Sequence, residues 1–170
     1  MMRARPAVLA LVLALVVAPA ATGCTRTPHP RPNPEPTTML TRQQAADAVD
    51  ALIKDAATHL SPTATIKVFA RNELPCGPGF APSGDDFAVE HTYDVLDYPG
   101  GVRTAVDTLR TYWLDNGFRP FNETKNPDGT VTGVGVQRIS DGFHARVFYN
   151  DAEDLMISAS STCVTSASPS

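Results

Sequence analysis

Three cysteines, Cys24, Cys76 and Cys163, are the residues of this sequence best suited to covalent chemistry. A thiol can be acylated, oxidised to a disulfide or used as a metal ligand. No two of the four histidines have the spacing of zinc ligands, and no His-Glu-x-x-His motif occurs. The sequence therefore predicts no metal site and no cofactor, which leaves acylation and oxidation for the cysteines.

Motifs for nucleophilic or acid–base catalysis are absent from the sequence. No Gly-x-Ser-x-Gly elbow occurs, and Gly133-Val134-Gly135 is an isolated Gly-x-Gly that indicates a bulge or close packing in a strand. Acidic residues are dense around residues 85–97, but strand alternation places Glu90 and Asp94 on the solvent side. A glycosidase needs one carboxylic acid in an apolar environment, so we interpret these two as surface charges and predict no enzymatic activity.

The N-terminal segment has the features of an export signal. Arg3 and Arg5 precede an apolar run of about 15 residues, which is too short for a permanent membrane span. The run ends in Ala20-Ala21-Thr22-Gly23-Cys24, which resembles the bacterial lipobox, although Leu is commoner than Ala at the position of Ala21. The sequence predicts a signal peptide over residues 1–23 and lipid on Cys24. Ordinary secretion, with cleavage after Ala18-Pro19-Ala20, is the alternative.

Counting the cysteines supports acylation, because three thiols in an exported chain leave one without a partner. If Cys24 carries lipid, Cys76 and Cys163 remain as a pair. Disulfides form and persist in oxidising compartments outside the cytosol. We therefore predict a disulfide between Cys76 and Cys163.

Charge argues against binding to nucleic acid. The 170-residue chain carries 14 basic and 18 acidic side chains. Without Arg3 and Arg5, the processed chain has 12 basic side chains against the same 18 acidic ones, a net charge of −6. A mildly acidic surface without a Lys/Arg cluster does not attract phosphate backbones.

The chain divides into four predicted parts. Residues 1–23 are the signal, residues 24–38 form an extended tether in which prolines alternate with other residues, residues 39–165 form one folded domain, and residues 166–170 are a frayed tail. Thr41 and Gln44 form a capping box that begins a helix extending to residue 60. A second helix follows Gly101 and stops at Asn116-Gly117.

Alternation of apolar and polar residues predicts the strands. They cover residues 65–71, 87–95, 118–124, 131–139, 143–149 and 155–163, and Asp-Gly turns separate several of them. The first strand should place Ile66, Val68 and Ala70 on one face. This pattern predicts an α+β fold, in the order α-β-β-α-β-β-β-β, with two helices on one face of a mostly antiparallel sheet. The strand order stays open, but the first and last strands should run in the same direction, which brings Cys76 and Cys163 to the same end of the sheet.

Several aromatic and basic residues are candidates for a binding site. Trp113 is expected to pack onto the sheet or, if partly exposed beside Tyr112, to line a ligand groove. His144, Arg146 and Phe148 share one strand phase and should form a contact face on the outer side of the sheet. Two other histidines have structural interpretations: His91 as a hydrogen-bonded residue of the core, and His59 as a cation at a helix C-terminus.

Short motifs within about residues 70–165 resemble those of small actinobacterial lipoproteins. The resemblance implies an exported protein with a lipobox cysteine and one cysteine pair, and it implies no activity. The motifs are Pro75-Cys76-Gly77, Tyr93-Asp94-Val95, Leu109-Arg110-Thr111-Tyr112-Trp113, Asn116-Gly117-Phe118, Asp141-Gly142-Phe143 and the segment from Leu155 to Cys163.

Taken together, these observations predict a non-catalytic binding or accessory domain held by lipid to the outer face of the cytoplasmic membrane. Its expected partner is an envelope protein or a small amphipathic ligand. Two alternatives stay open: a hydrolase that acts on cell-wall material, and a carrier of lipids or other amphiphiles.

Overall fold

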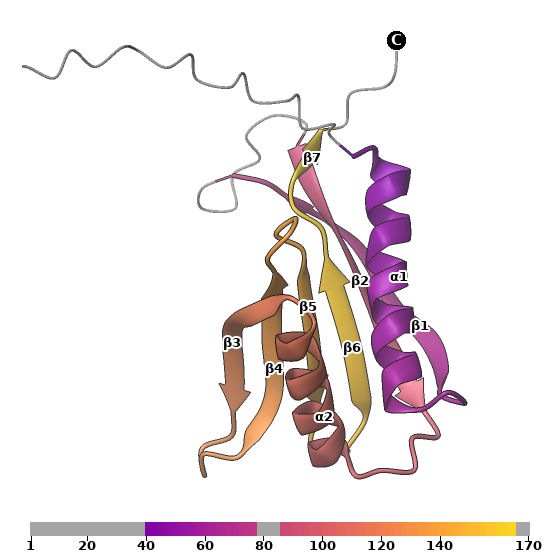
Figure 1. The fold of residues 1–170 in the computed structure, drawn as a ribbon, viewed down its shortest axis with the longest axis vertical. Coiled ribbons are helices and arrows are strands. Elements are labelled where there is room, and N and C mark those ends of the chain that lie inside the picture. Colours follow the sequence, from indigo (N-terminus) through magenta and orange to yellow (C-terminus); the bar gives the residue numbers. More distant parts are fainter. Residues whose placement is uncertain (1–39, 78–85, 166–170) are drawn as a thin grey trace, which may run out of the picture. The chain divides into compact units, whose positions relative to one another are not determined.

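The computed structural model describes residues 40–77 and 86–165, and these form an α+β fold (Figure 1). The elements follow in the predicted order α-β-β-α-β-β-β-β, with one additional short strand at the end. The helices are α1 (Arg42–Leu60) and α2 (Val102–Asp115). The strands are β1 (Thr65–Pro75), β2 (Asp86–Leu96), β3 (Phe118–Lys125), β4 (Val131–Arg138), β5 (His144–Tyr149), β6 (Leu155–Ser160) and β7 (Val164–Thr165).

The strands form one antiparallel sheet in the order β1-β2-β6-β5-β4-β3, and β7 pairs with the beginning of β2. Strand β6 therefore lies between the N-terminal hairpin, β1 and β2, and the strands β3 to β5. In this arrangement β1 and β6 run in the same direction, as predicted. The cysteines that follow them come to the same end of the sheet.

Both helices have the end that local sequence motifs predict. Thr41 caps α1: its hydroxyl accepts from the Gln44 backbone N–H, and the Gln44 side chain accepts from the Thr41 backbone N–H. The predicted capping box is thus confirmed. Helix α2 ends at Asp115 with Asn116 as its C-cap, and Gly117 adopts a φ of 83°, a left-handed conformation that glycine tolerates best.

The main core lies between the two helices and one face of the sheet (Figure 1). Helix α1 packs over β2 and β6, and helix α2 packs over β3, β4 and β5. Burial of these apolar side chains is the main source of stability. The largest of them are Trp113, Phe143, Ile53, Leu109 and Ile157. No helix in the described ranges is both long and apolar enough to cross a membrane.

Bulges interrupt the two outermost strands. The pairing of β1 with β2 shifts between Val68 and Ala70, so that Phe69 is the extra residue. The prediction that Ala70 shares a face with Ile66 and Val68 is therefore wrong. Beyond the bulge Arg71, opposite His91, takes the helix face in place of Ala70. The pairing of β3 with β4 shifts in the same way around Phe121.

The last predicted strand is shorter than expected, since β6 ends at Ser160 and the chain forms the separate strand β7 from Val164. Between them, Cys163 forms the predicted disulfide with Cys76, and their Cα atoms are 6.2 Å apart. Val164 packs in a small second core with Ala45, Phe87 and Val89. The predicted signal (residues 1–23), the lipid site at Cys24, the tether (24–38), Met39 and the tail (166–170) lie outside the described residues.

Candidate functional site

The face of the sheet opposite the helices carries His144, Arg146 and Phe148, as predicted. Residues directly opposite one another in antiparallel strands project to the same face. One row across this face contains Glu90, Ser160, His144 and Gln137, and the next contains Thr92, Ser158, Arg146 and Gly135. Both described helices pack on the other side (Figure 1). We refer to this side as the open face.

A hollow of about 310 Å³ lies on the open face, over β4, β5 and β6. We call it the open-face hollow. It contains donors, acceptors and one aromatic ring, but only one formal cation and one formal anion, Arg146 and Glu90. The side chains and backbone that line it belong to Glu90, Phe121, Asn122, Gly135, His144, Ala145, Arg146, Ser158, Ala159 and Ser160.

His144 is half-buried at one side of the hollow. The ring of Phe121, the bulge residue of β3, packs against the His144 ring with a centre-to-centre distance of 4.4 Å. Phe121 itself is 59% exposed. Desolvation by burial, with a smaller contribution from the charge of Arg119, lowers the pKa of His144 below its ordinary value. His144 is therefore neutral at neutral pH and can either donate or accept a hydrogen bond.

Arg146 is fixed across the neighbouring strand. Its Nη2 donates to Thr124 Oγ1 at 2.8 Å, and its guanidinium lies 4.7 Å from the centre of the Phe148 ring. The described part of the chain has two buried side-chain nitrogens without a hydrogen-bond partner, Arg146 Nε and His144 Nε2, and both belong to residues that line the hollow. Leaving such a buried group unpaired costs about 1–3 kcal/mol unless water or another molecule bonds to it.

Other polar side chains of the hollow also lack partners. Within the described residues, Glu90, Asn122, Ser158 and Ser160 make no side-chain hydrogen bond or ion pair. Asn122 lies against the backbone of Gly135, where an added Cβ would come within 2.1 Å of the Asn122 Oδ1 atom. Because Gly135 has no side chain, the amide of Asn122 lies close to the strand at this point and borders the hollow.

Trp113 does not line a groove, because it is 1% exposed and packs near Phe118 in the core. This is the first of the two arrangements that the sequence predicts for it. Tyr112 is on the surface, where its hydroxyl donates to Asp55 Oδ2 at 2.7 Å and its ring stacks on His59 at 3.9 Å. The hollow beside Tyr112 is bordered by the polar residues Asp107, Thr108, Thr111, Asp115 and Asn116. Tyr112 therefore connects the two helices.

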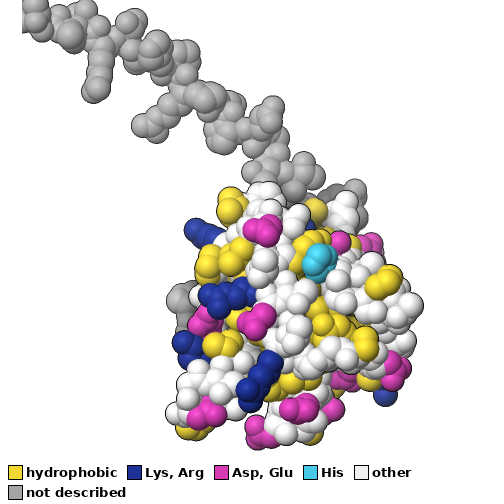
Figure 2. All heavy atoms as spheres, turned by 60° about the horizontal axis from the view of Figure 1, so that its bottom comes forward, with side chains coloured by type: hydrophobic (Ala, Val, Ile, Leu, Met, Phe, Trp, Pro, Cys, Tyr) yellow, Lys and Arg dark blue, Asp and Glu magenta, His cyan; other side chains and the backbone are white. Residues whose placement is uncertain are grey.

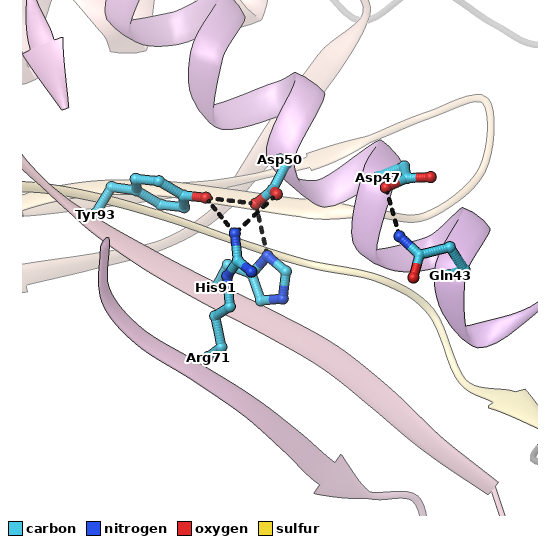
Figure 3. A network of polar contacts seen from close by, with 6 residues as sticks. All are labelled: Gln43, Asp47, Asp50, Arg71, His91 and Tyr93. Carbon is cyan, nitrogen blue, oxygen red and sulfur yellow. Dashed lines mark hydrogen bonds and ion pairs between the residues drawn. The ribbon is translucent and has the colours of Figure 1, made fainter. Parts of the chain in front are cut away.

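A second polar cluster lies beneath α1 (Figure 3). Asp50 Oδ1 accepts from His91 Nδ1 at 2.6 Å and from the Tyr93 hydroxyl at 2.9 Å. Arg71 Nη2 lies 3.3 Å from Asp50 Oδ2 and donates to the Tyr93 hydroxyl at 3.0 Å. Asp50 was not among the candidate residues identified from the sequence. Its position next to Val49, at the border of the apolar stripe, was the only local signal for this cluster.

The contacts of this cluster attach α1 to the sheet. Burial acts to raise the pKa of Asp50, but hydrogen bonds from His91 and Tyr93, together with the charges of His91 and Arg71, lower it below its ordinary value. The prediction that His91 is a buried, hydrogen-bonded histidine is confirmed, since it is 5% exposed. An ionised Asp50 thus accepts hydrogen bonds from β1 and β2 and ties α1 to the sheet.

The surface shown in Figure 2 carries acidic and basic side chains interspersed with small apolar areas, without a field of one sign. Across residues 40–77 and 86–165, no three His, Cys, Asp or Glu side chains are grouped as metal ligands would be. Comparisons of the chain with protein-family models, with curated proteins and with solved structures find no match. The candidate site is therefore defined by the chemistry of the chain's own residues.

Proposed function

We propose that this protein is an exported lipoprotein, acylated at Cys24 and held to the outer face of the cytoplasmic membrane, whose folded domain binds a partner without catalysing a reaction. The basic and apolar leader and the small residues before Cys24 support the export signal. The disulfide between Cys76 and Cys163 supports export independently, because such bonds are rare in the reducing cytosol.

The observation that carries the binding function is the set of unpartnered polar groups in the open-face hollow. Glu90, Asn122, Ser158 and Ser160 line the hollow, and their side chains have no hydrogen-bond or ion-pair partner among the described residues. In small-ligand sites, convergent polar groups fix the orientation of a ligand that packs on apolar or aromatic side chains, and this hollow offers polar groups beside the Phe121 ring. We therefore assign binding to this hollow.

Neither of the alternatives is favoured by an observation. A lipid carrier needs an apolar cavity, and Trp113, the residue expected to line it, is part of the core. A hydrolase needs a nucleophile or a bound water beside its acid and base. Ser161 has a buried hydroxyl, but that hydroxyl has a structural role. It accepts from the Val89 backbone N–H at 3.0 Å and donates to the Thr162 carbonyl at 2.7 Å, so it does not serve as a nucleophile.

Acylation is tested by expressing the full chain and its Cys24→Ser variant in a bacterium that makes lipoproteins, fed with an alkyne-labelled palmitate. We expect label and membrane association for the natural chain, and neither for Cys24→Ser. A natural chain that carries no label, or a variant that still carries it, would contradict the proposed anchor.

Binding is tested by native mass spectrometry of the full protein extracted from its own membranes. We expect an additional bound mass in the natural protein that disappears in Arg146→Gln and persists in Arg103→Gln. Arg103 is an exposed arginine of α2, so it controls for the loss of one positive charge. Two outcomes would contradict a binding role for the hollow: no additional mass on the natural protein, or the same additional mass on all three proteins.

A further inference from the structure

The donors and acceptors of the open-face hollow are balanced. Arg146 can only donate, the Glu90 carboxylate can only accept, and Asn122, Ser158 and Ser160 can do both. His144 adds a neutral imidazole. An anionic ligand would meet the charge of Glu90, and a cationic ligand would meet the charge of Arg146. The lining therefore suits a ligand without net charge that presents donors and acceptors close together.

Hydroxyl groups on a carbon ring have this property, because each hydroxyl donates one hydrogen bond and accepts others. The faces of such a ring are made of C–H groups, which pack well against an aromatic side chain. Phe121 supplies an aromatic ring at the border of the hollow, and 59% of it is exposed. The bulge at this point of β3 places Phe121 next to Asn122 on the open face, so a stacking group and an amide lie side by side.

The size of the hollow limits the ligand. Sites for small molecules occupy about 300–1,000 Å³. At about 310 Å³, the open-face hollow is at the lower end of that range, enough for one or two rings and too small for a long chain. The hollow is open to the surface, so a ring at the end of a longer polymer could enter it as well as a free molecule.

We infer that the open-face hollow binds a neutral, polyhydroxylated ligand of one or two sugar rings, with the rings packed against Phe121 and their hydroxyls bonded to Glu90, Asn122, Arg146, Ser158 and Ser160. This inference rests on the proposed binding function and specifies its ligand. The free saccharide and the end of an envelope polysaccharide share this chemistry.

The inference is tested with the full, ¹⁵N-labelled protein in an amine-oxide detergent, which carries no sugar. Methyl glucoside, cellobiose and N,N′-diacetylchitobiose are the neutral probes, and glucuronate is the matched charged probe. We expect at least one neutral probe to shift the Arg146 Nε–H and His144 side-chain signals with saturation. Glucuronate should bind at least about tenfold more weakly than the neutral probe that binds best. Tighter binding of glucuronate would overturn the inference.

Variants locate the binding. We expect Arg146→Gln, and separately Ser158→Ala, to lower the affinity for the neutral probe at least about fivefold. Arg103→Gln should leave that affinity unchanged. Ser158→Ala removes only a hydroxyl group, so it keeps the test valid if Arg146→Gln disturbs folding. Unchanged affinity in Ser158→Ala and in a folded Arg146→Gln would overturn the inference.

Sedimentation with purified cell-wall polysaccharide distinguishes the two sources of ligand. Binding of either the free sugar or the polymer, with the same dependence on Ser158, supports the inference. If no neutral probe shifts the signals while an Arg146-dependent mass still copurifies with the protein, the inference fails and the proposed binding function stands. If neither occurs, both fail.

Discussion

Asp50 connects α1 to both β1 and β2 through its carboxylate (Figure 3). Its carboxylate has partners that lie 21, 41 and 43 residues further along the chain. Because these partners are so distant, no local pattern could predict the cluster, although His91 was correctly predicted to be a hydrogen-bonded residue of the core. The position of Arg71 depends on the bulge at Phe69, which the sequence does not mark.

We predict that Asp50→Asn lowers the free energy of unfolding by about 1–3 kcal/mol at neutral pH, because hydrogen bonds to a charged group in a partly buried site are lost or weakened. Urea denaturation measures this change. Asp47→Asn is the matched control: Asp47 is on the same helix and, among the residues that the structure describes, accepts a hydrogen bond only from Gln43, so its replacement should change stability by less than about 0.5 kcal/mol. Equal effects of the two variants would contradict the structural role of Asp50.

The same cluster predicts a pH dependence. The pKa of Asp50 is lower in the folded state than its ordinary value of 3.8. The stabilising contribution of the carboxylate is therefore fully present above that value and is lost as the pH falls through the folded pKa. The stability difference between the natural protein and Asp50→Asn should shrink between about pH 5 and about pH 2.5. A difference that stays constant over this range would show that ionisation of Asp50 is not involved.

Among the elements, the helices and most strand boundaries follow from local sequence. The capping box at Thr41 and the Asn116-Gly117 stop set the helix ends, and Asp-Gly turns separate the later strands. The order of strands could not be predicted, because β6 pairs with β2, and that pairing joins segments far apart in the chain. Strand β7 was missed because two residues carry no periodicity.

Two glycines in β4 were predicted to mark close packing, and the structure distinguishes them. A Cβ at Gly133 would lie 2.8 Å from Phe148 Cβ and 3.1 Å from the Val147 carbonyl, neither of which can rotate away. At Gly135 the obstacle is the Asn122 side chain, which can turn. We predict that Gly133→Ala destabilises the fold by about 1–3 kcal/mol and that Gly135→Ala costs less. Chemical denaturation compares the two, and an equal or reversed order would contradict this view of the strand contacts.

For the whole molecule, the disulfide is the constraint with the longest reach, since 87 positions separate Cys76 from Cys163. Its prediction needed only cysteine counting and the direction of the strands, so it did not depend on the unpredictable strand order. The binding hollow is the opposite case. Its phase on β5 was predicted, but its lining also depends on Glu90 of β2 lying beside β6 and on the bulge at Phe121.

We predict that replacing Cys76 and Cys163 together by Ser lowers the free energy of unfolding by about 4 kcal/mol, mainly because the unfolded chain gains freedom. The melting temperature, followed by circular dichroism, should fall by about 10–20 °C. In the natural protein, purified in air and unfolded without a reductant, neither of these two residues should react with a thiol reagent. Two reactive thiols would contradict the disulfide.

The bulges in β1 and β3 have a consequence for how copies of the protein meet. An outermost strand with an unbroken row of backbone donors and acceptors is a template for joining sheets edge to edge, and this is a common route to aggregation. In this protein, the bulge at Phe69 divides one such row and the bulge at Phe121 divides the other, with Pro120 removing one further donor. Neighbouring molecules crowded together can therefore extend one another's sheet over only a few residues, which disfavours fibril growth.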